Sequence, residues 1–330
     1  MIDRFLSIKK EQKQRLFLLL LTLLALSLPI WLSTFRLILS IQILYLTILV
    51  MSFSFMAGQK GLLSLAQVSF FGIAGYSVGI LGVKSGWPFP YPHLIGLAGA
   101  TLAAAILGLI AIRVRDIPFL MLTLAFGEIV YGTARHWSAL TNGDNGINGI
   151  PPVEFAGISI NGAAQPVRFY YLALAVFVLC FWLLNKIDRS SFGLAHQGTK
   201  QSPKRLETLG YPVFWIKYTA FVICGFFAGV SGVLAAIFER VMHPESIWFG
   251  AIMFMLISAI LGGINSRIGP LVGVTVAIFL ERNLEPITDH YRIVVGVIFL
   301  ITILIARQGI MGYIETTRAY KKLLNFTGFD

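Results

Sequence analysis

Apolar residues form long uninterrupted runs along this chain, and charged residues are confined to short segments between them. A bilayer hydrocarbon core about 30 Å thick requires around 20 apolar residues in a helix, so such runs predict membrane-spanning helices. The run 268–281 is short and Gly-rich, which favours a partial or broken helix. The pattern therefore predicts an all-α, polytopic transmembrane bundle of about ten spans. The ten runs are 16–32, 37–56, 62–83, 93–112, 117–137, 168–185, 213–237, 247–265, 268–281 and 293–306.

The composition supports this prediction. Hydrophobic residues make up 57% of the 330 residues and charged residues 12%, whereas a soluble domain has about 25% charged residues. The net charge of +11 does not indicate a nucleic-acid-binding protein, because the Lys and Arg residues lie between apolar runs. The first run follows a basic segment, as in a signal peptide, but it is long and lacks a clear cleavage site, so we interpret it as a retained helix.

The distribution of basic residues predicts the orientation in the bilayer. If the N-terminus is cytoplasmic, 19 of the 26 Lys and Arg residues fall in inside segments or at the inner end of a span, and 7 fall outside. Because inside segments of membrane proteins are enriched in Lys and Arg, both termini are predicted to be cytoplasmic. The chain is then a single transmembrane domain, 1–330. Its flanking segments are a cytoplasmic N-terminal segment 1–15, an extracytoplasmic loop 138–167, a cytoplasmic loop 186–212 and a cytoplasmic tail 307–330.

A compact charged segment, "KQSPKRLETLGYP" (200–212), interrupts the apolar pattern on the inside. Ser202 suits the N-cap of a helix and Pro203 its first position. Gly210 suits the left-handed residue after the helix end, and Pro212 prevents continuation. One helix of about seven residues is predicted, too short to be stable alone in water. From the residues alone it is either a surface helix at the lipid headgroups or a docking element for a partner.

Several blocks, in this order, resemble the permease subunit of ATP-binding-cassette (ABC) importers for branched-chain amino acids. The resemblance covers nearly the whole chain from about residue 40. It rests on "GQKGLLSLAQVSFFGIAGYSVGIL" (58–81), "RVRDIPFLMLTLAFGEIV" (113–130), "LTNGDNGINGIPP" (140–152), "SSFGLAHQGTKQSPKRLETLGYPVFWIKYTAFVICGFFAGVSGVL" (190–234), "GGINSRIGPLVG" (262–273) and "ARQGIMG" (306–312).

The resemblance implies a coupling helix at 202–210, which in the family fits a groove on the ATP-hydrolysing subunit. The implied coupling residues are Ser202, Pro203, Lys204, Arg205, Leu206, Glu207, Leu209 and Gly210. Where relatives commonly carry alanines around an acidic residue, this chain has Arg205, Leu206, Glu207 and Thr208, so the partner's matching surface is expected to differ. Further implied partners are a second homologous permease, two cytoplasmic ATP-binding subunits and an extracytoplasmic solute-binding protein, at a bacterial inner membrane.

No motif for covalent chemistry accompanies these features. The chain lacks the G-x-x-x-x-G-K-[ST] phosphate-binding loop, the HExxH pattern and any metal-like spacing among its 5 His residues. The 2 Cys residues, Cys180 and Cys224, lie inside apolar runs and are interpreted as small packing residues. The chain is therefore predicted not to be an enzyme and to need no metal or cofactor of its own.

Polar and small residues inside the spans mark candidates for the translocation path. The Gly- and Ser-rich third run either packs tightly or lines the path, unwound near Gly58–Gly61. Glu128 lies in the middle of a run, where a carboxylate needs a partner or water. The candidate partners are Arg135 on the same face and a cation on another helix. The candidate path residues are Gly58, Gly61, Ser64, Gln67, Thr123 and Glu128.

The function predicted from the sequence is import of branched-chain or other hydrophobic amino acids, driven by separate ATPase subunits. Two alternatives stay open. A closely similar permease type carries urea and short amides, and an ion-coupled secondary transporter would work through Glu128.

Overall fold

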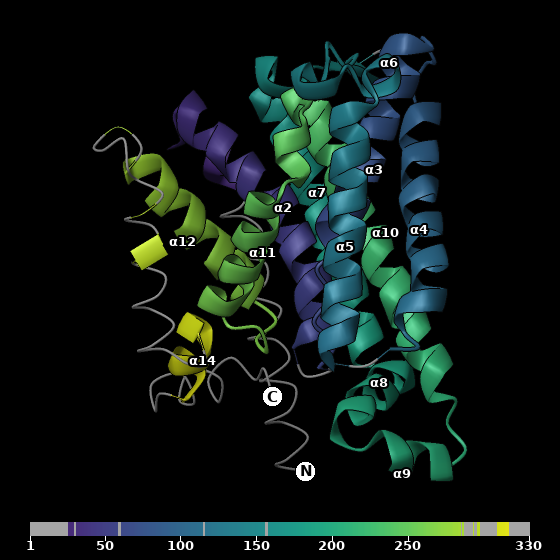
Figure 1. Cartoon of the computed structure of the whole chain (residues 1–330). Coiled ribbons are helices and arrows are strands. Elements are labelled where there is room, and N and C mark those ends of the chain that lie inside the picture. The colour runs from purple at the N-terminus through teal and green to yellow at the C-terminus, as the bar shows by residue number, and fades with distance from the viewer. Residues whose placement is uncertain are drawn as a thin grey trace.

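The structure is a computed structural model that describes residues 26–29, 31–58, 61–114, 116–155, 158–284, 286, 293, 296–297 and 309–316. It is a helical bundle with two small two-stranded sheets (Figure 1). Five of the described helices are long and apolar enough to cross a membrane. These are α2 (Thr34–Ala57), α4 (Tyr91–Ala111), α5 (Asp116–His136), α7 (Pro166–Asp188) and α10 (Val213–Glu239).

The other described elements are shorter. The helices are α3 (Gln67–Gly79), α6 (Ser138–Thr141), α8 (Ser191–Gln201), α9 (Pro203–Thr208), α11 (Phe249–Gly262), α12 (Gly269–Leu284) and α14 (Gly309–Thr316). A π-helical turn, η1 (Ile80–Lys84), continues α3, and the 3-10 turns are η2 (Gly143–Asn145), η3 (Gly162–Ala164) and η4 (Pro244–Ile247). The strands are β1 (Ile147–Asn148), β2 (Val153–Phe155), β3 (Ile158–Ile160) and β4 (Val241–Met242).

Eight of the ten predicted runs correspond to described helices. The run 62–83 is a correction, because residues 61–66 are not helical and α3 begins only at Gln67. Gly61 has a left-handed backbone (φ +75°), so it does not belong to a right-handed helix. The run 268–281 forms α12, whose 16 residues span about 24 Å and fall short of a full crossing. The runs 16–32 and 293–306 lie almost wholly outside the described residues.

The core of the bundle lies where α3 and α10 pack against each other and against α2 and α4. Gly232 of α10 allows this packing, because a Cβ atom there would overlap the backbone of Phe71 in α3. Ser231 beside it donates a hydrogen bond to the carbonyl oxygen of Tyr45 in α2 (2.6 Å). Helices α11 and α12 form a hairpin on the other side of α2 (Figure 1).

One end of the bundle carries a cap built from the segments 142–164 and 240–248. Strand β1 pairs with β4, and β2 pairs with β3 as a hairpin within the loop 138–167. Arg240 holds the two segments together by donating to the carbonyl oxygen of Ile150 (2.9 Å) and to the side-chain oxygen of Asn161 (3.2 Å). We call this the cap end, and the opposite end, where α8 and α9 lie, the α9 end (Figure 1).

The cap packs into a row of glycines along α3 and η1. The row consists of four glycines, and a Cβ atom at any of them would contact a side chain of the cap. The cap can approach this closely because the glycines have no side chains. The glycine row is thus explained by close packing at these positions. The contacts are Gly72 with Ile247, Gly75 with Met242, Gly79 with Ile147, and Gly82 with Pro151.

Candidate functional site

The charged segment predicted to form a short helix does so at the α9 end. Helix α9 covers Pro203–Thr208, with Ser202 at the N-cap and Pro203 at the first position. Gly210 has φ +83°, and the amides of Gly210 and Tyr211 donate to the carbonyl oxygens of Glu207 and Leu206 (both 3.0 Å). These two bonds form a Schellman motif, which confirms the predicted role of the glycine.

The N-cap position of Ser202 is confirmed, but two details of this helix differ from the sequence-based interpretation. The Ser202 hydroxyl makes no capping hydrogen bond, because the backbone at this residue (φ −160°, ψ 89°) joins α8 directly to α9. Leu206 and Leu209 are three residues apart, a spacing that predicts a shared face on a helix, but only Leu209 is exposed. A Cβ atom on Gly198 of α8 would lie 3.0 Å from Leu206, which shows that this leucine packs inward on α8. Leu209 is 73% exposed.

A second helix, α8 (Ser191–Gln201), lies in the loop for which only one helix was predicted. The hydroxyl of Ser190 accepts a hydrogen bond from the amide of Gly193 (3.4 Å) and caps this helix. His196 is fully buried beside Phe55 of α2, with 5.9 Å between the ring centroids. The Ser-Ser pair that follows the run 168–185 is a helix-start signal that sequence reasoning missed. It was missed because α8 has too few apolar residues to show a helical period.

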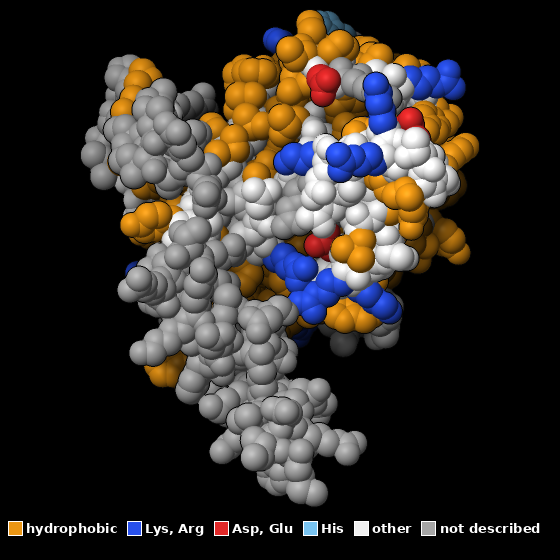
Figure 2. Space-filling view, turned by 90° about the horizontal axis from the view of Figure 1, so that it is seen from below, with side chains coloured by type: hydrophobic (Ala, Val, Ile, Leu, Met, Phe, Trp, Pro, Cys, Tyr) orange, Lys and Arg blue, Asp and Glu red, His pale blue; other side chains and the backbone are white. Residues whose placement is uncertain are grey.

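The outer surface of α8 and α9 combines apolar and charged side chains. Leu194 (65%), Leu209 (73%) and Tyr211 (49%) are exposed, and Lys204, Arg205 and Glu207 are exposed beside them. Figure 2 looks at this end of the molecule and shows Lys and Arg side chains gathered there. An exposed apolar surface with charges at its rim is suited to docking a protein partner.

Lys200 at the end of α8 connects this unit to the break between α2 and α3. Its ammonium group donates to the carbonyl oxygen of Gly58 (3.2 Å). A Cβ atom on Gly61 would lie 2.8 Å from the Lys200 side chain, so the lysine stem packs on the left-handed glycine. Gly58 also packs against the backbone of Ile264 between α11 and α12. The break therefore lies between α8 and the α11–α12 hairpin.

Most of the candidate path residues meet just beyond this break. The amide of Leu65 donates to the hydroxyl of Thr123 in α5 (3.2 Å), and the amide of Ala66 donates to the hydroxyl of Ser64 (3.3 Å). Gln67 follows as the first residue of α3, and Ser64, Gln67 and Thr123 are all fully buried. Within the described part of the chain, neither amide atom of the Gln67 side chain has a hydrogen-bond partner. The chain thus places a group of neutral polar side chains between α3 and α5.

Glu128 does not join this group. Its side chain is exposed on another face of α5, and the predicted ion pair with Arg135 is absent. Arg135 instead binds Asp144 of the cap (2.8 Å), because η2 lies directly beside the end of α5. No hydrogen bond or ion pair of Glu128 is found among the described residues. Around it, Ile117 (71%), Met121 (63%) and Ile129 (65%) are also exposed.

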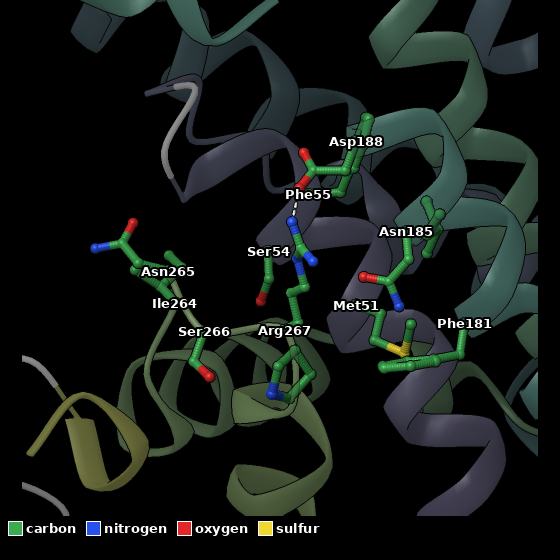
Figure 3. A pocket seen from close by; sticks show the side chains of 12 residues that line it. Met51, Ser54, Phe55, Phe181, Asn185, Asp188, Ile264, Asn265, Ser266 and Arg267 are labelled. Carbon is green, nitrogen blue, oxygen red and sulfur yellow. Dashed lines mark ion pairs between the residues drawn. The ribbon is translucent and has the colours of Figure 1, made fainter. Parts of the chain in front are cut away.

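A small cavity of about 80 Å³ opens at the α9 end between α2, α7 and the α11–α12 turn (Figure 3). The Arg267 side chain extends across it toward Asp188, the last residue of α7, at 3.6 Å. Ser54 and Asn185 line the cavity beside this ion pair. The pair therefore joins the hairpin to the helix that leads into α8. No group of three His, Cys, Asp or Glu side chains able to hold a metal ion occurs in the described ranges.

The bundle contains five described helices that are long and apolar enough to cross a membrane, which defines a multi-pass membrane protein. The α8–α9 unit protrudes from one end of this bundle. The family described as "Branched-chain amino acid transport system / permease component" matches residues 35–305. The chain belongs to this family of transport permeases, which are components of transporters and not enzymes.

Two curated proteins are similar over most of the chain. The high-affinity branched-chain amino acid transport system permease protein LivM of Salmonella typhimurium is 26% identical over 321 residues, covering 91% of this chain and 75% of the relative. The protein of the same description from Escherichia coli K12 is 27% identical over 335 residues, covering 95% of this chain and 78% of the relative. No solved structure matches.

The end of α9 allows a direct test of its geometry. Replacing Gly210 with valine is expected to destabilise the helix end by about 1 kcal/mol, because left-handed backbone is unfavourable for a residue with a side chain. No atom lies within 4 Å of a Cβ at this position, so the cost is conformational and not steric. If α9 is the coupling helix that the sequence predicts, ATPase stimulation in the assembled transporter should fall more than expression does.

Gly86 provides the matched control, since it also has positive φ (+66°) and open space around it, in the turn after η1. Gly86→Val should leave ATPase stimulation unchanged. If Gly210→Val leaves it unchanged as well, the end of α9 does not take part in coupling.

Proposed function

We propose that this chain is the permease of an ABC importer that carries branched-chain or other hydrophobic amino acids across a bacterial inner membrane. Two cytoplasmic ATP-binding subunits supply the energy, a second homologous permease completes the pore, and an extracytoplasmic solute-binding protein delivers the cargo. The α9 end faces the cytoplasm, and the cap end faces the binding protein. Membership in the permease family and the basic residues at the α9 end support this proposal.

The observation that carries the proposal is the α8–α9 unit. It protrudes from the bundle, exposes Leu194 and Leu209, and contacts the α2–α3 break through Lys200. A partner that grips α9 can thereby move the backbone at Gly58 and Gly61. Closure of the ATPase dimer would rock the helices between outward and inward openings, as in other rigid-body transitions.

The exposed face of α5 is proposed to border the translocation path, opposite the second permease. Glu128 lies about 18 Å along α5 from its first residue, so it is within the span. A carboxylate at that depth requires a polar partner or water and cannot remain in lipid. Gly132 lies one turn further on, and a Cβ atom there would have no other atom within 4 Å, which leaves room for a close helix of another subunit.

The chemistry of the cargo separates the main proposal from its nearest alternative. Urea and short amides are neutral, and they need hydrogen-bond donors and acceptors without charge.

An ion-coupled transporter, the other alternative, is favoured by one observation, the exposed Glu128 within a span. In that case uptake would collapse with a protonophore and with Glu128→Gln, and it would need no ATPase.

The test of docking is Leu209→Asp. Since Leu209 is exposed and contributes little to the fold, its replacement should leave the chain folded. Binding of the ATPase subunit should fall by about tenfold or more, as at a central interface residue, and ATP-driven uptake of L-leucine should fall with it. Co-purification and uptake into proteoliposomes measure the two effects.

Val114→Asp is the matched control, because Val114 is an exposed apolar residue (38%) in the turn between α4 and α5 and belongs to neither α8 nor α9. It should retain both the ATPase subunit and uptake. Retention of the ATPase subunit by Leu209→Asp would exclude α9 as the docking element. Uptake by the purified chain alone, without nucleotide, would exclude the importer.

A further inference from the structure

A polar cluster toward the cap end joins α2 to the last residue of α10. The side-chain amide of Gln42 and the hydroxyl of Tyr45 both donate to Oε1 of Glu239, at 3.0 and 3.1 Å. These residues are 197 and 194 positions apart in the sequence. Oε2 of the same carboxylate accepts no hydrogen bond within the described ranges. Glu239 is exposed, whereas Tyr45 is 6% exposed, so a buried donor fixes an accessible carboxylate.

The electrostatic setting of this carboxylate favours a cation. Glu239 lies at the C-terminal end of a 27-residue helix, where the helix dipole adds negative potential. The neighbouring Arg240 does not neutralise it, because its guanidinium is turned toward Ile150 and Asn161 of the cap.

An apolar strip adjoins the cluster. Phe35 and Ile38 precede Gln42 by seven and four residues, so they lie on the same face of α2. Phe35 is 62% exposed, and Ile38 is half-buried. A fixed carboxylate at the end of α10 therefore adjoins an apolar strip on α2.

We propose that Glu239, oriented by Gln42 and Tyr45, forms an outer subsite for the ammonium group of a zwitterionic, apolar α-amino acid. The ammonium binds Oε2 of Glu239, and the apolar side chain of the ligand lies along Phe35. This inference rests on the proposed import of amino acids and adds where the cargo first contacts the permease. It also separates amino acids from urea and amides, which carry no ammonium group for the carboxylate.

The test uses Glu239→Gln, which keeps an oxygen to accept the bonds of Gln42 and Tyr45 but removes the charge. The wild-type chain in lipid nanodiscs should bind L-leucine, measured by saturation-transfer NMR, and should not bind 4-methylpentanoate, which has the same skeleton without the ammonium group. The variant should bind L-leucine about fivefold more weakly, as expected for an exposed ion pair. Its thermal unfolding should match that of the wild type.

Glu245→Gln is the matched control, because Glu245 of η4 is an exposed carboxylate at the same end without a bond to α2. It should bind L-leucine as the wild type does. The inference is overturned if Glu239→Gln binds L-leucine normally, or if the wild type binds both probes equally or neither. ATP-driven L-leucine uptake by the assembled wild-type transporter tests the proposed function separately, so a failed subsite leaves that function standing.

Discussion

Replacing Gly232 with valine is expected to prevent the bundle from folding. The Cβ atom alone would overlap the backbone of Phe71, and backbone in a helix cannot move aside as a flexible side chain can. The cost should exceed ~3 kcal/mol, the upper part of the range for overpacked cores. The effect reaches the whole molecule, since α3 and α10 form the centre of the core. The measurement is the yield of monodisperse protein in detergent and its thermal unfolding.

Gly99→Val is the control for this experiment. Gly99 also lies inside a helix, α4, but a Cβ atom there would approach Ile73 and Ser77 only to 3.9 Å, an ordinary contact. This variant should give protein of near wild-type yield and unfolding temperature. A Gly232→Val protein that melts with the wild type would show that α3 and α10 do not approach each other as described.

Replacing Lys200 with methionine is expected to separate ATPase docking from transport. The methionine retains most of the apolar stem that packs on Gly61 but loses the bond to the carbonyl oxygen of Gly58. Because α9 is unchanged, the ATPase subunit should still bind. Uptake should fall by about tenfold, which is within the usual range for the coupling between two sites. ATP hydrolysis should continue.

Lys186→Met controls for the loss of one positive charge at the same end. Among the described residues, the interaction found for Lys186 is with Trp182 on its own helix, where the ammonium nitrogen lies 4.8 Å from the ring centroid. Its replacement should leave the ratio of uptake to hydrolysis unchanged. An unchanged ratio in Lys200→Met would mean that movement of α9 reaches the spans by another route, for which the Asp188–Arg267 ion pair is the next candidate.

The sequence predicts the helical class and the short helix at 203–208 well, because both depend on local signals. Runs of apolar residues set the position of a span, and Pro203 and Gly210 mark the two ends of α9. The family resemblance was confirmed by the match over residues 35–305. The count of ten spans and the orientation of the termini stay predictions.

The features that could not be predicted depend on contacts between distant segments. An apolar run does not show that residues 61–66 stay out of helix, since this depends on the left-handed backbone of Gly61 and its contact with Lys200. Likewise, the spacing of Glu128 and Arg135 suits an ion pair, but the cap brings Asp144 closer. The inward packing of Leu206 depends on α8, which the apolar pattern does not reveal.

The glycine row of α3 has a consequence for biosynthesis. Residues 72–82 emerge early from the ribosome, yet the side chains that cover them belong to residues 147–151 and 242–247. Until roughly three quarters of the chain has been translated, the glycine row lacks part of the cap that packs on it. Assembly is slow in such a case because the contacts join segments that are distant in sequence. Lipid tails or an insertion chaperone must cover the glycine row until then. Fragments that end before residue 240 should therefore be good substrates for membrane proteases.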